Sequence, residues 1–83
     1  MKIKTGKLFI VATPIGNWQD ITLRALEILK KVDLIVCEEL REGSTLLRKL
    51  DIKGKQLFCL NEHNEIEETP NLINLLAQGQ EIA

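Results

Sequence analysis

No apolar run in the sequence is long enough to cross a membrane. Hydrophobic residues make up 45% of the 83 residues, but none of the runs approaches the roughly 18 residues of a spanning helix. The stretch 8–15 is also too short for the core of a secretory signal, and it contains Pro14. We therefore expect a cytoplasmic protein without a membrane partner.

The sequence also lacks a strong net charge and the cysteine spacing of a metal site. The formal net charge is −1, so a nucleic-acid role needs a local basic face. The two cysteines, Cys37 and Cys59, both lie in apolar runs. These positions favour buried, reduced thiols over a disulfide, and we expect no metal site.

Two familiar phosphate-binding motifs are missing. The sequence contains neither the G-x-G-x-x-G of dinucleotide sites nor the Gly-Lys-Ser/Thr of a P-loop. Their absence excludes these two ways of holding a nucleotide. At 83 residues the chain forms one small domain at most.

Apolar runs alternate with helical spacing along the chain. Continuous apolar runs predict buried strands at 7–12, 33–37 and 56–60, and the start of a fourth at 80–83. Helical spacing predicts a helix from Asp20 or Thr22 to Lys31 and a short helix at 44–50. The order predicts an α/β fold in which right-handed crossovers build a parallel sheet. Because the chain reaches only the start of the fourth strand, we expect a longer protein.

A third helix is predicted to begin within 65–70, with Thr69 as its cap and Pro70 as its first residue. We expect the buried sides of the second and third helices to consist of aliphatic residues: Leu46, Leu47, Leu50, Leu72, Ile73, Leu75 and Leu76.

Polar clusters follow three of the predicted strands, at 13–17, 38–41 and 61–64. The carboxyl ends of parallel strands meet at one edge of a sheet, where ligands bind. Pro14 and Gly16 make the first cluster a rigid turn with exposed backbone groups, which suits close approach by a flat small molecule. A plain connection that needs Pro and Gly for its geometry explains the turn equally well.

Five collinear motifs resemble the tetrapyrrole methylase family, the class III S-adenosylmethionine-dependent methyltransferases, and within it a branch that methylates ribosomal RNA. The motifs are VATPIGN at 11–17, DITLRAL at 20–26, VDLI at 32–35, EELR at 38–41 and EHNE at 62–65. The resemblance implies the N-terminal part of the cofactor-binding domain 1, with a three-layer parallel sheet. It also implies that the rest of domain 1 and a second domain are absent from the 83 residues.

The resemblance further implies transfer of a methyl group from S-adenosylmethionine to the ribose 2′-oxygen of a cytidine in 16S rRNA of the small ribosomal subunit. Pro14, Ile15 and Gly16 resemble the family's first cofactor-contacting turn. Glu38 is the first candidate for the catalytic base and His63 the second. Four further residues are candidates for substrate binding: Asn17, Glu39, Arg41 and Asn64.

Structural roles explain the same residues. Glu38 and Glu39 fit a solvated strand end, Arg41 fits an ion pair with a neighbouring carboxylate, and His63 fits hydrogen bonding within a loop. Two other functions stay open: a methylase of the same family that acts on a porphyrin-type substrate, and a non-catalytic α/β binding module. The porphyrin branch usually carries a Gly-Pro-Gly-Asp type of turn where this sequence has TPIGN at 13–17.

The family's strand order, 3-2-4-1-5, puts the fourth strand between the first and the second. A chain that holds only the start of that strand leaves the sheet with exposed edges, which invite pairing between copies. We therefore expect a homodimer, and an isolated 83-residue chain that is inactive.

Overall fold

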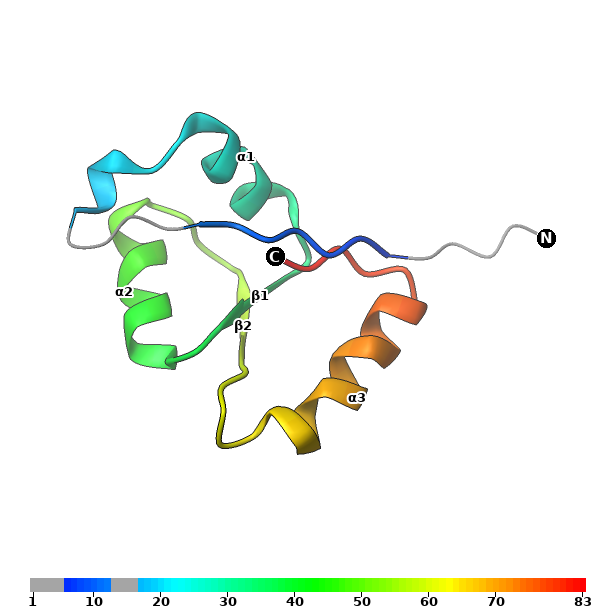
Figure 1. Cartoon of the computed structure of the whole chain (residues 1–83). Coiled ribbons are helices and arrows are strands. Elements are labelled where there is room, and N and C mark those ends of the chain that lie inside the picture. The colour runs from blue at the N-terminus through cyan, green and yellow to red at the C-terminus, as the bar shows by residue number, and fades with distance from the viewer. Residues whose placement is uncertain (1–5, 13–16) are drawn as a thin grey trace.

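Helices and strands alternate along the chain, as the sequence predicts. The computed structural model describes residues 6–12 and 17–83, so the predicted cofactor turn Pro14, Ile15 and Gly16 lies outside the described residues. The elements are η1 (Trp18–Asp20), α1 (Leu23–Lys31), β1 (Leu34–Cys37), α2 (Leu40–Lys49), β2 (Gln56–Cys59) and α3 (Glu65–Ala77) (Figure 1). The described part is thus an α/β structure with a small parallel sheet, which confirms the predicted class.

Strands β1 and β2 form the sheet. They pair in parallel, from Leu34 opposite Gln56 to Cys37 opposite Cys59. Beyond the last pair, the Leu60 N–H donates to the Cys37 carbonyl at 2.9 Å. Both strands therefore end at the same edge, and the residues that follow them in sequence start next to each other.

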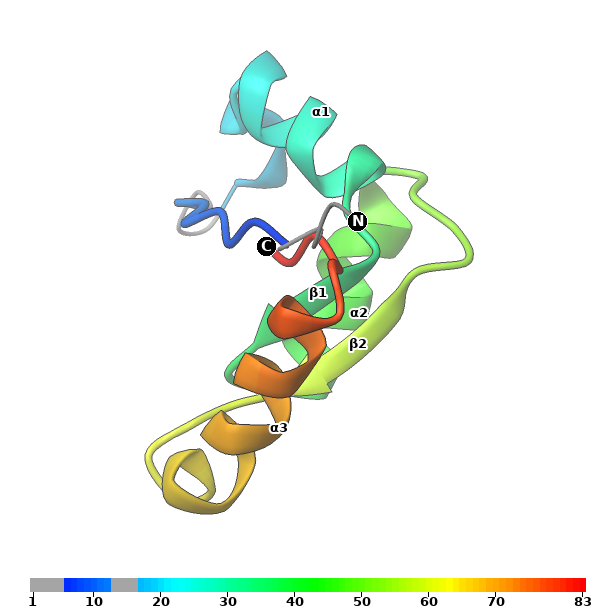
Figure 2. The ribbon, with the colours of Figure 1, turned by 90° about the vertical axis from the view of Figure 1, so that its right-hand side faces the viewer.

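The segment 80–83 runs between β1 and the N-terminal segment 7–9. Ile82 makes parallel bridges to Leu8 on one side and to Leu34 on the other. The Phe9 N–H donates to the Ile82 carbonyl at 2.8 Å, and the Val36 N–H donates to the Ala83 carbonyl at 2.7 Å. Figures 1 and 2 both show the two terminal segments side by side. The fourth apolar segment thus lies between the first and the second, where the resemblance puts it.

The predicted first strand, 7–12, is not formed as a continuous strand. Among the described residues only Leu8 carries a bridge there. Ile10 is 90% exposed and Leu8 is 56% exposed, so the prediction that both are buried is wrong. A strand needs hydrogen-bonding partners along its length, and among the described residues this segment bonds to the segment 80–83 only through Lys7, Phe9 and Ile82.

Helix α1 begins where the sequence predicts. Thr22 is its N-cap, and the Thr22 hydroxyl oxygen accepts a hydrogen bond from the Ala25 N–H at 3.0 Å. Lys30 and Lys31 occupy the last turn, next to the negative end of the helix dipole. Leu29 is buried and packs against Ile35 of the sheet within one cluster.

Helix α2 begins at Leu40, earlier than the predicted start at Ser44. The Ser44 hydroxyl donates to the Leu40 carbonyl at 2.7 Å, so Ser44 bonds within the helix instead of capping it. Glu39 holds the N-cap position without a side-chain hydrogen bond to the helix. The start of α2 therefore carries no capping signal in the sequence. Because the helix begins at Leu40, Arg41 is helical and does not lie in the loop after β1.

Helix α3 begins at Glu65, at the near end of the predicted range, and contains Pro70 in its interior. Thr69 and Pro70 are therefore not its cap and first residue. Three acidic residues in the first turn suit the positive end of the helix dipole. Ile73 is 60% exposed, contrary to the prediction that it is buried, whereas Leu72 is buried.

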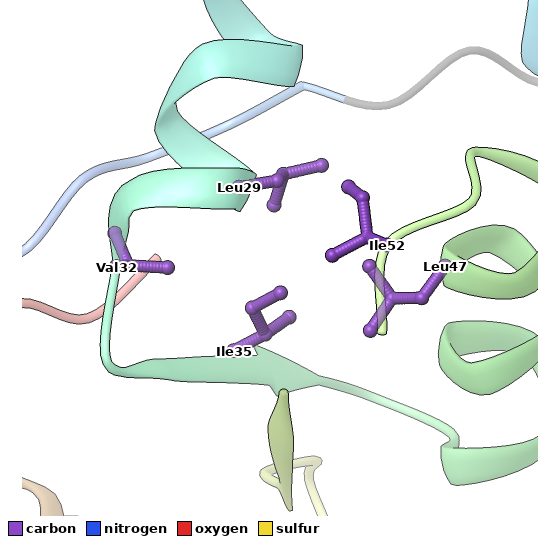
Figure 3. Close-up of a cluster of buried hydrophobic side chains, with 5 residues drawn as sticks. All are labelled: Leu29, Val32, Ile35, Leu47 and Ile52. Atoms are coloured by element: carbon purple, nitrogen blue, oxygen red, sulfur yellow. The ribbon is translucent and has the colours of Figure 1, made fainter. Parts of the chain in front are cut away.

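Two hydrophobic clusters cover the two faces of the sheet. Leu34 and Ile35 are neighbours in β1, so their side chains point to opposite faces. The α1 and α2 side holds Leu29, Val32, Ile35, Leu47 and Ile52 (Figure 3). The α3 side holds Leu34, Leu72 and Ile82. Figures 1 and 2 agree that α2 and α3 lie on opposite sides of the strands. Within 6–12 and 17–83, no helix is long and apolar enough to cross a membrane.

Replacing Ile82 by alanine is expected to destabilise the chain by about 2–5 kcal/mol, because its side chain is fully buried and its removal leaves a cavity. The matched control is Ile66→Ala, the same change at an exposed position, with an expected effect within about 0.5 kcal/mol. Urea unfolding monitored by circular dichroism measures both free energies. Equal effects of the two substitutions would contradict the observed packing of residues 80–83.

Candidate functional site

Two cavities lie at the edge where β1 and β2 end. One has a volume of about 390 Å³ and is lined by Val11, Leu29, Ile35, Val36, Cys37, Glu38, Glu39, Glu42, Gly43, Leu46, Leu47 and Ala83. The other has a volume of about 490 Å³ and is lined by Glu38, Glu39, Glu42, Asn61, Glu62 and His63. We call the first the apolar cavity and the second the polar cavity. Three carboxylates, those of Glu38, Glu39 and Glu42, line both.

The predicted pair Glu38 and His63 thus shares the polar cavity. Glu38 follows the last residue of β1, and His63 lies in the loop that follows β2. The parallel register brings together these residues, which are far apart in sequence. Both side chains are exposed, so a bound molecule can reach either one.

Asn61 connects the two loops by hydrogen bonds. Its side-chain Nδ2 donates to the Glu38 carbonyl at 3.2 Å and to the Cys59 sulfur at 3.4 Å. Its Oδ1 accepts a hydrogen bond from the His63 N–H at 2.9 Å. One half-buried amide therefore fixes the main chain at both candidate catalytic residues.

Asn64 holds the same loop from its other end. Its Oδ1 accepts a hydrogen bond from the Asn61 N–H at 2.8 Å, and its Nδ2 donates to the Cys59 carbonyl at 2.9 Å. Its side chain is therefore engaged within the protein, and substrate binding by Asn64 stays a prediction. Asn61 was not among the predicted site residues. The signal for it was the pair of asparagines in a short loop, since asparagine side chains commonly bond to backbone two or three residues away.

Acidic side chains dominate the edge where β1 and β2 end. Glu38, Glu39 and Glu42 put three carboxylates around the shared wall of the two cavities, so a cationic group is favoured there and an anionic one is repelled. His63 Nε2 lies 3.8 Å from Glu62 Oε1, but both side chains are more than 80% exposed. Solvent screens such a pair, and it contributes little to stability.

Cys37 lines the apolar cavity. Burial raises the pKa of its thiol, and the neighbouring Cys59 and Glu39 raise it further. A raised pKa keeps the Cys37 thiol protonated at neutral pH.

The comparison with known families decides which family the chain belongs to. The sequence model described as tetrapyrrole (corrin/porphyrin) methylases matches residues 7–83. The chain belongs to the tetrapyrrole methylase family. This match covers β1, β2 and every residue described here that lines the two cavities.

Among curated relatives of this methylase chain, several carry the name ribosomal RNA small subunit methyltransferase I. Those of Pasteurella multocida (strain Pm70) and Haemophilus influenzae (strain ATCC 51907 / DSM 11121 / KW20 / Rd) are 53% identical over 95% of the chain. That of Escherichia coli O157:H7 is 49% identical over 94% of the chain. The chain spans 28%, 28% and 27% of the length of these relatives.

Of the predicted site residues that the structure describes, three line neither cavity of the methylase chain: Asn17, Arg41 and Asn64. Arg41 is exposed in the first turn of α2 and does not line either cavity. No ion pair joins Arg41 to a carboxylate among the residues that the structure describes. Asn17 caps η1, where its Oδ1 accepts a hydrogen bond from the Gln19 N–H at 3.1 Å. The polar cavity thus brings together Glu38, Glu39 and His63 but not Asn17, Arg41 or Asn64.

Replacing Asn61 by alanine is expected to speed amide exchange at His63 by up to about tenfold, because the His63 N–H loses its acceptor and a hydrogen bond contributes about 0.5–1.5 kcal/mol. Asn74→Ala is the matched control, since Asn74 is exposed on α3. Residue-resolved hydrogen exchange by NMR measures both variants. Unchanged exchange at His63 in the Asn61 variant would show that the amide does not hold this loop.

Proposed function

We propose that the chain is the N-terminal portion of an S-adenosylmethionine-dependent methyltransferase that modifies the ribose 2′-oxygen of a cytidine in 16S rRNA of the small ribosomal subunit. The observation that carries the proposal is the identity of 53% over 95% of the chain to relatives named ribosomal RNA small subunit methyltransferase I. The motifs of the resemblance lie in this matched region. A ribosomal substrate implies that the protein works in the cytoplasm.

The apolar cavity fits the cofactor. S-adenosylmethionine supplies, when bound, a methyl group on a positively charged sulfur. Leu29, Ile35 and Leu47 offer an apolar wall for a flat adenine ring. Glu38 and Glu39 offer negative charge to the cationic sulfur and amino group. In our proposal the turn Pro14, Ile15 and Gly16 contributes the backbone contacts that the family resemblance implies.

The polar cavity supports the catalytic assignment. In our proposal Glu38 removes the proton from the ribose hydroxyl, and His63 is the alternative base. Glu38 lines both cavities, so one carboxylate borders the proposed methyl donor and the proposed acceptor. Positioning two reactants against each other is a large part of the catalysis of group transfer. Asn17, Glu39, Arg41 and Asn64 remain our candidates for contacts to the RNA.

The proposed domain organisation follows from the length of the relatives. The chain spans 28% of them, so we propose that it is the N-terminal portion of cofactor-binding domain 1, whose complete form is a three-layer parallel sheet. The rest of domain 1 and a second domain would lie in the remaining length. By itself the chain supplies only part of the proposed cofactor site, and the isolated 83 residues should therefore be inactive.

Replacing Glu38 by glutamine in the full-length protein is expected to lower methyl transfer by about 10²–10⁴-fold, because the amide cannot accept the proton. Glu67→Gln is the matched control, since Glu67 is exposed on α3 and lines neither cavity. The assay measures transfer from labelled S-adenosylmethionine to small ribosomal subunits of a strain without the modification. A full rate in Glu38→Gln together with a similar loss in His63→Gln would assign the base to His63.

The wild-type protein in the same assay separates the three functions. Label at a ribose 2′-oxygen of 16S rRNA supports the proposal. Label on a porphyrin-type substrate and none on RNA would assign the protein to the other branch of the family. No transfer to either substrate would favour a binding module and overturn the proposed activity.

We also propose that the chain forms a homodimer through the incompletely paired N-terminal segment, where Leu8 and Ile10 are exposed. Ile10→Lys is expected to shift the 83-residue chain toward the monomer, because a charge on an edge opposes pairing. Ile66→Lys is the matched control, at an exposed isoleucine on α3. Light scattering across a concentration series measures the mass. A wild-type chain that stays monomeric at high concentration would contradict the proposed dimer.

A further inference from the structure

The two cysteines of the chain occupy one rung of the parallel sheet. Cys37 ends β1, Cys59 ends β2, and the two are partners in the register. Neighbouring strands lie about 4.8 Å apart. This separation falls within the roughly 4.4–6.8 Å between Cα atoms that a disulfide can span. The backbone therefore already meets the first requirement for a bond between the two sulfurs.

Both side chains also point to the same face of the sheet. Ile35 belongs to the cluster on the α1 and α2 side, and Leu57 packs against that cluster. Because side chains alternate along a strand, Cys37 and Cys59, each two residues further on, share that face. In agreement, the presence of Cys59 raises the pKa of the Cys37 thiol.

Small oxidants can reach the pair. Both cysteines are free and only partly buried, and Cys37 lines the apolar cavity. Gly43 of α2 lies directly over Cys37, since a Cβ on Gly43 would come within 2.8 Å of the Cys37 sulfur. The absence of a side chain at Gly43 thus leaves the space that the Cys37 sulfur occupies.

We propose that Cys37 and Cys59 are a redox-sensitive pair that forms a reversible disulfide within one chain. The two thiols release two protons and two electrons as the sulfur–sulfur bond forms. With hydrogen peroxide as the oxidant, the two electrons break the oxygen–oxygen bond, and the two protons complete two water molecules. With a small disulfide such as oxidised glutathione, two thiol exchanges leave two molecules of reduced glutathione.

Oxidation changes how the main chain at Glu38 is held. In the reduced protein the Cys59 thiol donates a hydrogen bond to the Glu38 carbonyl at 3.3 Å. A disulfide sulfur carries no hydrogen, so this bond is lost and only the Asn61 amide still donates to that carbonyl. The state of the sulfur pair thus acts on the residue that borders both cavities. This consequence is independent of the reaction that the protein catalyses.

Peptide mapping of the oxidised full-length protein tests the pair directly. The native protein is treated with hydrogen peroxide or oxidised glutathione, its remaining thiols are blocked in denaturant, and trypsin is added. Cleavage after Lys31, Arg41 and Lys55 puts Cys37 in the peptide 32–41 and Cys59 in a peptide that begins at Gln56. The expected product is the two peptides joined, two hydrogen atoms lighter than their sum, and separated again by a reducing agent.

Two controls tie the product to the native geometry. Cys37→Ser and Cys59→Ser should each abolish the joined peptide. Oxidation of the wild-type protein in denaturant should lower its yield at least tenfold relative to other pairings, because the register no longer holds the sulfurs together. The wild-type comparison stands even if a serine variant fails to fold.

Three results would overturn the proposal. The first is recovery of both peptides with blocked thiols after oxidation of the native protein. The second is a disulfide that joins either cysteine to another copy of the chain. The third is the same yield of the joined peptide from native and denatured protein.

Discussion

The parallel pairing of β1 with β2 is the constraint on which the rest of this structure depends. It aligns Cys37 with Cys59, and the chain leaves both strands at the same edge. Glu38 and Asn61 therefore start side by side, and the Asn61 amide can reach the Glu38 carbonyl. The acidic edge, the two cavities and the cysteine pair all follow from this one register. A shift of the pairing by one residue would move every side chain of one strand to the other face of the sheet. The acidic edge, the two cavities and the cysteine pair would then all be lost.

Burial on both faces holds that register in place. Ile35 packs toward α1 and α2, and Leu34 packs toward α3 and Ile82. The segment 80–83 adds hydrogen bonds to β1 and to the segment 7–9 at once. The N-terminal segment gains far less from burial, since the side chain of Ile10 is exposed. The centre of the sheet is thus the stable part of the chain. The candidate site lies next to it, at the edge where β1 and β2 end.

The sequence predicts the elements whose signals are local. Apolar runs mark β1 and β2, and Thr22 marks the start of α1 by a hydrogen bond within one turn. The start of α2 was misplaced because Glu39 makes no capping bond with its side chain. Ile10 was predicted as buried because a continuous apolar run does not reveal whether a partner strand is present.

The candidate site shows the same difference between features with a signal in the sequence and features that depend on distant partners. Topology alone predicted that Glu38 and His63 share an edge, because parallel strands end together. Arg41 was grouped with them because the helix start was placed too late, and the structure puts it outside both cavities. The bond from Asn61 to the Glu38 carbonyl could not be predicted from the sequence, because it depends on the register of two strands, whereas the bond that Asn61 accepts from the His63 N–H is local. Scalar coupling across the hydrogen bond from the Leu60 N–H to the Cys37 carbonyl is the most direct test of that register. The account predicts this coupling in the NMR spectrum of the labelled protein, and a coupling from Leu60 to the Val36 or Glu38 carbonyl instead would contradict it.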